Sequence, residues 1–483
     1  MLADKLFGDI WCSNFDNIDI TGIAYDSRAV MSGNVFVCVK GFETDGHKYV
    51  DSAIKNGASI IVAQDKVDVE VPVIYVENTR RTLADLACTY YGNPSEKFKL
   101  IGVTGTNGKT TTTYLIKSIL EEAGLCVGVI GTNQNIIGDK VLLTQSTTPT
   151  TPNSLELQQL FAEMAQSNAD CVVMEVSSHA LELDRVRGCN FDVGVFTNLT
   201  QDHLDFHKTM ENYKAAKAKL FDISKCGVVN VDDLAGADIS NEKKCDILTI
   251  GADSECAFKA SNIKITASGV DFDVAYNNNT YPMHLCIPGK FSVYNAMCAA
   301  GAALSIGIDI ETIRKGLNNA TGVVGRLEVV PTDTDYTVII DYAHTPDGLE
   351  NIIKAAKEFA QGRVVTLFGC GGDRDNTKRS VMGEIAGALS DYSIITSDNP
   401  RTENPLSIIE MIESGIKKTN GEYIVIPDRR EAILYALQTA QKGDVIILAG
   451  KGQETYQIIG KEKFDFDERV VVYQSLRKIR EGK

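Results

Sequence analysis

Short hydrophobic runs alternate with amphipathic stretches through most of the chain. In the first hundred residues, the runs at 35–39, 59–62 and 71–76 predict strands, and the helical spacing over 82–91 predicts a helix. The turn-forming sequence Gly92-Asn-Pro-Ser95 then interrupts the pattern. It predicts a boundary near residue 97.

From residue 99 onward the pattern repeats as apolar run, Gly-rich turn, long helix and apolar run. Strands are expected at 100–103, 127–130 and 171–176, with helices at 110–123 and 154–165. A strand-like stretch at 257–286 and a helix at 293–304 precede Gly322-Val-Val-Gly-Arg326, which is typical of a joint. Alternation of this kind indicates parallel α/β architecture.

A third α/β unit follows the joint. Its strands are expected at 337–340, 364–368, 393–396, 423–426 and 445–448, separated by helices such as 348–359 and 378–389. We therefore predict an α/β protein of three domains. They are a small α/β domain over 1–97, a central P-loop-type domain with a mostly parallel sheet over 98–326, and a Rossmann-like domain over 327–483.

Composition narrows the class of protein. A chain of 483 residues is long enough for about three domains. Its net charge of −16 argues against a dedicated nucleic-acid binder, and its twelve scattered cysteines form no C-x-x-C pair. The N-terminus lacks a signal-peptide pattern, and the weakly polar run at 296–308 is too short to cross a bilayer. We expect a cytoplasmic protein with no nucleic-acid partner and no membrane insertion.

The first chemical motif joins a predicted strand to a predicted helix, where backbone N–H groups and a helix N-terminus converge on a polyphosphate. Lys109 supplies charge to the β- and γ-phosphates, and Thr110 supplies a hydroxyl for Mg²⁺. The general loop has Gly where this chain has Val103. The motif comprises Gly105, Thr106, Asn107, Gly108, Lys109, Thr110 and Thr111.

Polar motifs also lie at the ends of later strands. Met174-Glu-Val-Ser-Ser-His179 places Glu175 at a strand end, and Thr200-Gln-Asp-His-Leu-Asp-Phe-His207 contains two histidines and two aspartates. Ligands of open α/β sheets bind at the carboxyl ends of strands, so Glu175 and His203 are candidates to complete a Mg²⁺ shell.

These motifs, with Asn212-Tyr-Lys-Ala-Ala-Lys-Ala-Lys-Leu-Phe221, resemble the Mur ligase family of peptidoglycan synthesis along the whole chain. The resemblance implies ATP-dependent activation of a carboxylate as an acyl phosphate, followed by amide-bond formation. It implies that CO₂ carbamylates Lys217, which joins the metal site with Thr110, Glu175 and His203. It also implies that Asn295, Arg326 and Asp341 hold ATP, and that catalysis involves Lys109, Lys217, His203 and Arg326.

The resemblance extends to two further substrates. Tyr25-Asp-Ser-Arg28 is similar to the UDP-sugar-binding segment of the members that add the third residue of the stem peptide, and Ser27 is expected at the uridine end. The implied contacts to the muramoyl dipeptide, UDP-MurNAc-L-Ala-D-Glu, are Ser27, Thr147, Thr148, Ser177 and Arg185.

The amino-acid substrate is expected at the motif 397–405, which follows a predicted strand. A guanidinium binds a carboxylate with two parallel hydrogen bonds, and meso-diaminopimelate has a distal carboxylate that lysine lacks. Arg401 therefore favours diaminopimelate, with Arg374 as a second carboxylate clamp. The full set expected to bind this substrate is Arg374, Asp398, Asn399, Pro400, Arg401, Gly450 and Glu454.

Several alternatives remain at this point: a lysine-adding Mur ligase, a folylpolyglutamate synthase, and a non-catalytic P-loop nucleotide-binding protein. The segment with Ser27 and the motif with Arg401 speak against the synthase. A guanine-reading Asn-Lys-x-Asp motif, which a nucleotide switch would need, is absent from the sequence. We expect a monomer with the three small-molecule substrates named above.

Overall fold

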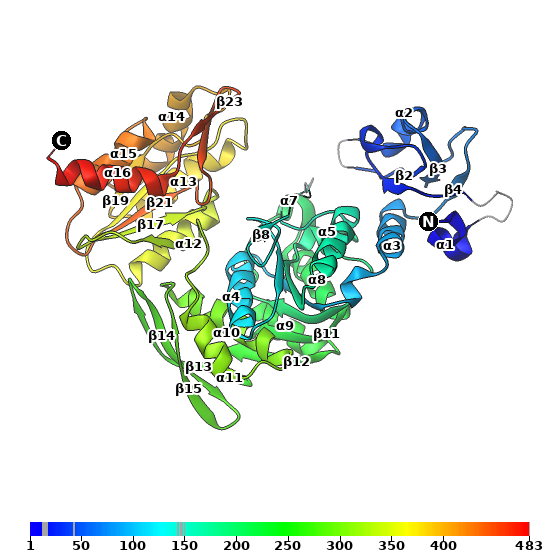
Figure 1. Ribbon diagram of the computed structural model, residues 1–483. Coiled ribbons are helices and arrows are strands. Elements are labelled where there is room, and N and C mark those ends of the chain that lie inside the picture. Colours follow the sequence, from blue (N-terminus) through cyan, green and yellow to red (C-terminus); the bar gives the residue numbers. More distant parts are fainter. Residues whose placement is uncertain (12–17, 42–43, 143, 145–147, 149, 483) are drawn as a thin grey trace. The chain divides into compact units, whose positions relative to one another are not determined.

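The computed structural model (Figure 1) describes residues 1–11, 18–41, 44–142, 144, 148 and 150–482. Its contacts divide it into two compact units. The first comprises Met1–Ala257 with Cys298–Ile313, and the second comprises Phe258–Met297 with Arg314–Lys483. These units differ from the three domains expected at 1–97, 98–326 and 327–483, whose boundaries stay a prediction.

The N-terminal part of the first unit is a small parallel sheet in the order β1 (Gly22–Ala24), β2 (Asn34–Val37), β3 (Ala58–Ala63) and β4 (Val73–Tyr75). Val35 and Val37 face one hydrophobic cluster, whereas Phe36 faces another, because side chains alternate along a strand. Both faces of the sheet are therefore buried. The helices of this part are α1 (Ala3–Phe7), α2 (Val50–Lys55) and α3 (Thr79–Tyr91), with short 3₁₀ turns at Gly8–Ile10, Ser27–Ala29, Gly46–Tyr49 and Pro94–Glu96.

The rest of the first unit is built on a larger sheet. Six parallel strands lie side by side in the order β12, β11, β10, β5, β9, β6. Beyond β6, the antiparallel strands β7 and β8 form the edge. Its strands are nearly all apolar, as strands covered on both faces require. In chain order they are β5 (Lys99–Thr104), β6 (Val127–Ile130), β7 (Ile136–Ile137), β8 (Lys140–Val141), β9 (Cys171–Glu175), β10 (Phe191–Phe196), β11 (Ser224–Asn230) and β12 (Asp246–Gly251).

The strand order places a topological switch point beside β5. After β5 the chain crosses toward β6, but after β10 it crosses toward β11 on the other side, so the loops after β5 and β10 open on a shared crevice. The helices of this sheet are α4 (Lys109–Glu122), α5 (Ser154–Gln166), α6 (Ser178–Glu182), α7 (Leu204–His207), α8 (Met210–Asp222) and α9 (Leu234–Glu242). Two later helices are α10 (Lys290–Ser305) and α11 (Ile310–Asn318).

The second unit contains an antiparallel meander of β13 (Phe258–Thr266), β14 (Gly269–Tyr276) and β15 (Asn279–Leu285). Its main sheet has the order β16, β17, β21, β18, β19, β20, in which only β16 is antiparallel (Figure 1). The strands are β16 (Glu328–Val330), β17 (Thr337–Asp341), β18 (Val364–Phe368), β19 (Tyr392–Ile395), β20 (Tyr423–Val425) and β21 (Val445–Ala449). The remaining elements are α12 (Pro346–Lys357), α13 (Thr377–Leu389), α14 (Pro405–Ile416), α15 (Arg429–Gln438), α16 (Glu468–Arg480) and the hairpin of β22 (Tyr456–Ile459) and β23 (Glu462–Asp465).

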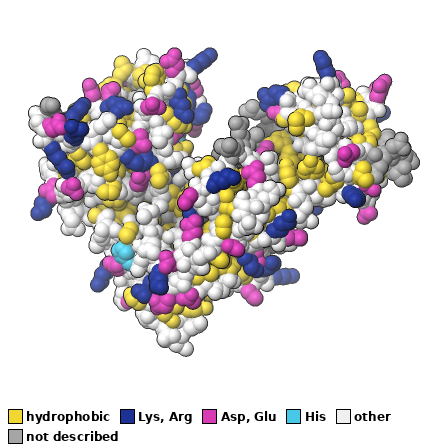
Figure 2. All heavy atoms as spheres, viewed as in Figure 1, with side chains coloured by type: hydrophobic (Ala, Val, Ile, Leu, Met, Phe, Trp, Pro, Cys, Tyr) yellow, Lys and Arg dark blue, Asp and Glu magenta, His cyan; other side chains and the backbone are white. Residues whose placement is uncertain are grey.

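The predicted α/β class with a mostly parallel central sheet is confirmed. Among the described residues, no helix combines the length and apolar character needed to span a bilayer. On the face shown in Figure 2, basic and acidic side chains are interspersed. The described cysteines are all free thiols, in agreement with the expectation from their spacing.

Candidate active site

The phosphate loop connects β5 to α4 through two glycines that a side chain could not replace easily. Gly105 has a φ of 149°, and a methyl group on it would lie 1.9 Å from Thr197 Oγ1. Gly108 has a φ of 85° and caps α4, whose first turn therefore begins at Lys109. Val103, where the general loop has its first glycine, is a fully buried residue of β5. The loop in this chain is thus shorter at its start.

The loop after β10 holds the phosphate loop in place. Asn198 accepts from the backbone N–H groups of Thr106 (2.9 Å, at its carbonyl) and Asn107 (2.9 Å, at Oδ1). Thr197 Oγ1 donates to the carbonyl of Asn107 at 2.6 Å. The ammonium of Lys109 donates to the carbonyl oxygens of Gly105 (3.0 Å) and Thr106 (2.8 Å). The phosphate loop is therefore fastened to the loop after β10, and the Lys109 ammonium lies against its carbonyl oxygens.

Thr110 and Glu175 meet below this loop, as expected from the sequence. The Thr110 hydroxyl donates to Glu175 Oε1 at 3.0 Å, and both residues are buried. Thr132 completes the arrangement, because its N–H donates to Glu175 Oε1 (2.9 Å) and its hydroxyl to Oε2 (3.2 Å). The hydrogen on Thr110 points to the carboxylate, so the hydroxyl lone pairs stay available. A hydroxyl and a carboxylate are oxygen donors of the kind that Mg²⁺ prefers.

Lys217 is brought to the same place by α8. Its side chain is 1% exposed, its Nζ donates to the carbonyl of Gly105 at 2.7 Å, and it lies 4.5 Å from the centroid of the Tyr213 ring. Burial and the neighbouring cation of Lys109 hold the pKa of Lys217 well below its usual range. A lysine with a lowered pKa has a larger fraction of neutral amine at neutral pH.

Three histidines gather beside Tyr213. The ring of His179 lies 4.8 Å from that of His203 and 5.5 Å from that of His207, measured between centroids. His207 Nε2 pairs with Ser178 Oγ at 2.9 Å, and the His207 ring stacks on Tyr213. Burial lowers the pKa of all three imidazoles, that of His179 to about 4. The group is therefore neutral at pH 7, and its nitrogens can act as ligands or acceptors.

Three of the five residues expected at the muramoyl dipeptide converge on Thr151, which was not among the predicted residues. Thr148 Oγ1 and Arg185 NH1 both donate to the Thr151 carbonyl, at 2.9 and 3.0 Å. The Thr151 hydroxyl accepts from Ser177 N at 3.0 Å and donates to the carbonyl of Glu175 at 2.9 Å. This group is thus joined to the Thr110–Glu175 pair. Thr147 lies outside the described residues.

Arg185 is held in this group with part of its guanidinium unsatisfied. Its Nε is buried without a hydrogen-bond partner, and burial lowers its pKa. An anionic substrate group would satisfy that donor. Ser27 lies in the N-terminal sheet part, at the start of a 3₁₀ turn, where its carbonyl accepts from Asn56 Nδ2 at 2.8 Å.

In the second unit, Arg326 and Asp341 lie together around Tyr342. The Arg326 guanidinium carbon is 5.0 Å from the centroid of the Tyr342 ring, and its Nε is buried without a partner. Asp341 accepts from the N–H groups of Leu327 (2.7 Å) and Ala343 (2.8 Å). Asn295 is buried in α10. These three residues belong to the second unit, whereas the phosphate loop belongs to the first.

The motifs expected at the amino-acid substrate form a polar network at the carboxyl ends of β18, β19 and β21. Asn399 Nδ2 donates to Glu454 Oε2 at 2.9 Å, and the fully buried Lys451 donates to Asn399 Oδ1 and Glu454 Oε2, both at 3.1 Å. Gly450 has a φ of 117°, and a methyl group there would lie 2.7 Å from Asp398 Oδ2. Lys451 was not among the predicted residues, although it lies inside a motif that was.

Arg374 and Arg401 come from two neighbouring loops and approach each other near Gly371. A methyl group on Gly371 would lie 2.9 Å from Arg401 NH1 and 3.8 Å from Arg374 Cγ. Arg401 has a φ of 50°, its NH1 donates to the Gly372 carbonyl at 2.8 Å, and its backbone pairs with the β22–β23 hairpin through Ile458 and Gly460. The carbonyl of Pro400 lies so close to Gly372 that a methyl group there would stand 1.9 Å from it.

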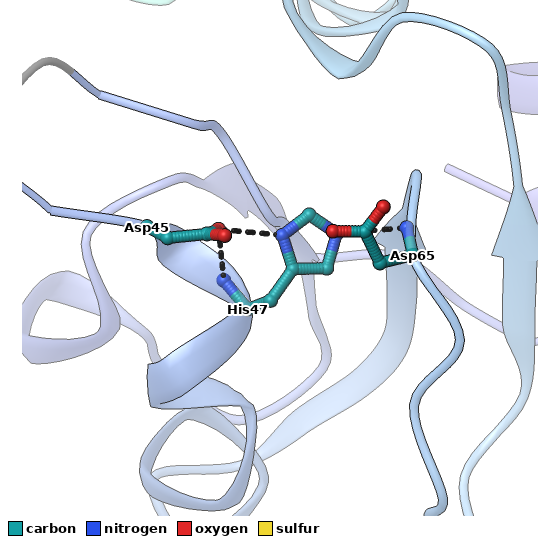
Figure 3. A group of neighbouring side chains, drawn as sticks. All are labelled: Asp45, His47 and Asp65. Atoms are coloured by element: carbon teal, nitrogen blue, oxygen red, sulfur yellow. Dashed lines mark hydrogen bonds and ion pairs between the residues drawn. The ribbon is translucent and has the colours of Figure 1, made fainter.

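One cluster outside these motifs has the composition of a metal site but lacks a free imidazole nitrogen. Asp45, His47 and Asp65 lie together in the N-terminal sheet part (Figure 3). His47 Nδ1 lies 2.6 Å from Asp45 Oδ1, and His47 Nε2 accepts from the N–H groups of Gln64 (3.0 Å) and Asp65 (3.2 Å). Both ring nitrogens are thereby engaged, so His47 acts as a structural link.

Three family models match the chain, and together they cover most of it. "Mur ligase family, catalytic domain" matches residues 19–91, "Mur ligase middle domain" matches 103–303, and "Mur ligase, glutamate ligase domain" matches 325–452. These segments contain every side chain named in this subsection except Glu454 and those of the β22–β23 hairpin.

Relatives of known name are similar over the full length. A protein of Clostridium acetobutylicum named UDP-N-acetylmuramoyl-L-alanyl-D-glutamate–2,6-diaminopimelate ligase 1 is 48% identical, with 99% of this chain and 100% of that protein covered. A ligase of the same name from Caldanaerobacter subterraneus subsp. tengcongensis is 52% identical, with 95% of each covered. A solved structure of such a ligase has a TM-score of 0.71 at 30% identity, over 95% of both chains.

Proposed function

This chain belongs to the Mur ligase family, and we propose that it is the member that joins meso-diaminopimelate to UDP-MurNAc-L-Ala-D-Glu at the expense of ATP. The observation that carries the proposal is the pair of arginines, Arg374 and Arg401, beside the network of Asn399 and Glu454. Guanidinium groups bind carboxylates, and Glu454 offers an anion to an ammonium. A diamino dicarboxylic acid presents both groups.

The phosphate loop supports ATP as the activating substrate. Backbone N–H groups at the start of α4 and the Lys109 ammonium provide the positive charge that a polyphosphate needs. Lys109 now binds two loop carbonyls, and it would exchange these for phosphate oxygens, which are stronger acceptors because they are charged. We assign Arg326, Asn295 and Asp341 to the remainder of the ATP in the catalytic complex.

A Mg²⁺ ion fits the residues around Thr110. We propose that Thr110, Glu175, His203 and a carbamylated Lys217 hold this ion. His203 would act as a neutral donor, and the carbamate of Lys217 as an anionic one. When bound, the ion neutralises charge that develops on the phosphoryl oxygens. The unmodified ammonium of Lys217 would repel it, whereas carbamylation converts that cation into an anion. The low pKa of Lys217 favours the modification, because CO₂ reacts with the neutral amine.

The chemical steps follow from these positions. The γ-carboxylate of D-Glu attacks the γ-phosphorus of ATP, ADP leaves, and an acyl phosphate forms. The amine of diaminopimelate then attacks the acyl carbon, and the tetrahedral adduct collapses with loss of phosphate and a proton. The residues around Thr151, with Arg185, orient the muramoyl dipeptide next to the Thr110–Glu175 pair. No nucleophile from the protein is required.

The decisive measurement is phosphate release with ATP, UDP-MurNAc-L-Ala-D-Glu and either diaminopimelate or lysine. We expect turnover with diaminopimelate and at least about a tenfold lower kcat/KM with lysine, since one charge-assisted pair contributes about 1.5–3 kcal/mol. Arg401→Lys should remove most of that preference by raising KM for diaminopimelate alone. Equal turnover of the wild-type enzyme with lysine would contradict the assignment and favour a lysine-adding ligase.

We also propose that the enzyme acts in the cytoplasm as a monomer. The free thiols of the described cysteines suit a reducing compartment. Sedimentation of the purified protein at micromolar concentration tests the monomer, and a stable dimer would contradict it.

A further inference from the structure

Arg379 is a fully buried cation, and its guanidinium binds both oxygens of one carboxylate. It stands in the first turn of α13 with 0% of its surface exposed. NH1 donates to Glu403 Oε2 and NH2 to Glu403 Oε1, both at 2.8 Å, while NH2 also reaches the carbonyl of Gly371 at 3.2 Å. Removing either partner leaves an uncompensated charge, which makes this pair a strong constraint on geometry.

The same pair connects the two loops that follow β18 and β19. The Glu403 carboxylate accepts a third hydrogen bond, at Oε1, from the N–H of Asp373 at 2.5 Å. Asp373 returns the contact, since its carboxylate accepts from the hydroxyl (2.8 Å) and N–H (3.2 Å) of Thr402. Gly372 N donates to the Asn399 carbonyl at 2.9 Å. Apart from the hydrogen bonds of Arg379 itself, all of these bonds join residues 371–373 of one loop to residues 399–403 of the other.

Each loop carries one of the two arginines assigned to the substrate carboxylates. Arg374 follows Asp373 directly, and Arg401 lies two residues before Glu403. The distance between the two guanidinium groups therefore depends on how the loops are fastened together. We propose that Arg379 and Glu403 form a positioning pair that sets the spacing of Arg374 and Arg401, and thereby the selectivity for a substrate with a second carboxylate. This inference rests on the proposed function.

The chemistry of the pair explains why an arginine is needed. A planar guanidinium binds both oxygens of Glu403 and leaves a lone pair of Oε1 for the N–H of Asp373, so the carboxylate joins Arg379 to the loop of Asp373. A lysine ammonium is a point charge and fixes only one of them. Neither Arg379 nor Glu403 is expected to touch the substrate, so their effect passes through the loops.

The test uses Glu403→Gln and Arg379→Lys in the full-length enzyme, with kcat and KM measured for each substrate. We expect KM for diaminopimelate to rise about tenfold or more, because a shift of about 1 Å in a binding group has effects of that size or greater. KM for ATP and for the muramoyl dipeptide should stay within about twofold. Activity with lysine, which has no distal carboxylate to place, should change little, so the preference for diaminopimelate over lysine should fall by about the same factor.

A general loss of stability gives a different result, because it lowers activity with both amino acids equally and leaves their ratio unchanged. That outcome would overturn the proposal. If Arg379→Lys does not fold, Glu403→Gln decides alone, since this side chain is a third exposed. Glu403→Asp, which keeps the charge, should recover part of the lost preference.

Arg363→Lys is the matched control. Arg363 also donates two hydrogen bonds to a buried carboxylate, both to Oδ2 of Asp444, but at the amino ends of β18 and β21. The Arg363→Lys variant should leave the preference for diaminopimelate over lysine unchanged. The two hypotheses fail separately: a wild-type enzyme without preference for diaminopimelate contradicts the proposed function, whereas a wild-type preference that survives in Glu403→Gln contradicts only the positioning pair.

Discussion

The Nζ atom of Lys217 lies 2.7 Å from the carbonyl oxygen of Gly105, so a buried amine donates a hydrogen bond to the first residue of the phosphate loop. Carbamylation leaves one hydrogen on Nζ, so the N–H can still donate to the Gly105 carbonyl. The two oxygens of the carbamate would then add an anionic group beside the phosphate loop. The loop and the lysine are thus coupled.

We expect the activity of the enzyme to depend on CO₂ through Lys217. Removal of dissolved CO₂ should lower the rate of phosphate release, and bicarbonate should restore it. Lys217→Ala should abolish activity, and bicarbonate should not restore it. Lys217→Arg is the sharper control, since it keeps a cation that cannot be carbamylated. An active Arg variant would show that the carbamate is unnecessary. Carbon-labelled bicarbonate and NMR would detect the adduct directly.

Glu175→Gln should raise the Mg²⁺ concentration that the enzyme needs for phosphate release. The amide keeps the shape of the side chain but loses the negative charge next to Thr110. Metal affinity should fall about 10–100-fold, as is usual when a group that holds or orients a ligand is changed. The measurement is phosphate release as a function of Mg²⁺ at saturating ATP. Glu182→Gln, a surface carboxylate paired with Lys219, should leave the curve unchanged. A normal Mg²⁺ dependence in Glu175→Gln would remove this residue from the metal site.

Gly105→Ala should impair nucleotide use more than it impairs folding. The added methyl group would overlap Thr197 Oγ1 at 1.9 Å, so the loop must move by about 1 Å, and displacements of that size cost about 100-fold in kcat/KM. Gly124→Ala is the control. Gly124 has a φ of 81°, but nothing lies within 4 Å of its added methyl group. It should lose about 1 kcal/mol of stability and keep its KM for ATP. Equal kinetics in the two variants would contradict the role of the loop.

The Arg379–Glu403 pair should make the free energy of unfolding depend on pH in the acidic range. The guanidinium lowers the pKa of Glu403 to about 2 from its usual 4.5. A carboxylate with a lowered pKa stabilises the fold above pH 4.5, and this stabilisation is lost as pH falls toward 2, because the unfolded chain takes up the proton first. The contribution is about 1–2 kcal/mol once solvent screening at a partly exposed group is allowed for.

The difference in unfolding free energy between the wild type and Glu403→Gln should therefore shrink between pH 5 and pH 3. Chemical denaturation followed at several pH values measures it. Arg363→Lys controls for the general effect of weakening a buried ion pair. If the difference in unfolding free energy stays constant with pH, the folded protein does not lower the pKa of Glu403, and the prediction is wrong.

Local sequence patterns were sufficient for many of the elements and for the identity of the motifs. The alternation around residues 100–176 predicted strands that agree with β5, β6 and β9 within one or two residues, because hydrophobic period and turn residues act over short distances. The glycines of the phosphate loop were likewise readable, since positive φ angles favour glycine in any context. Strands β10 to β12 and helices α14 to α16 were not identified beforehand.

The sequence by itself determined the chemistry that each segment could perform, including the cationic loop at Lys109 and the two arginines, Arg374 and Arg401, proposed to bind carboxylates. Only the tertiary structure decided which segments meet. The placement of β5 between β9 and β10 brings Thr110 to Glu175 and Lys217 to Gly105, the latter across 112 positions of the chain. The roles of Thr151, Lys451 and Arg379 became visible in the same way. Strand order is set by packing of the whole sheet, and no local pattern of residues encodes it.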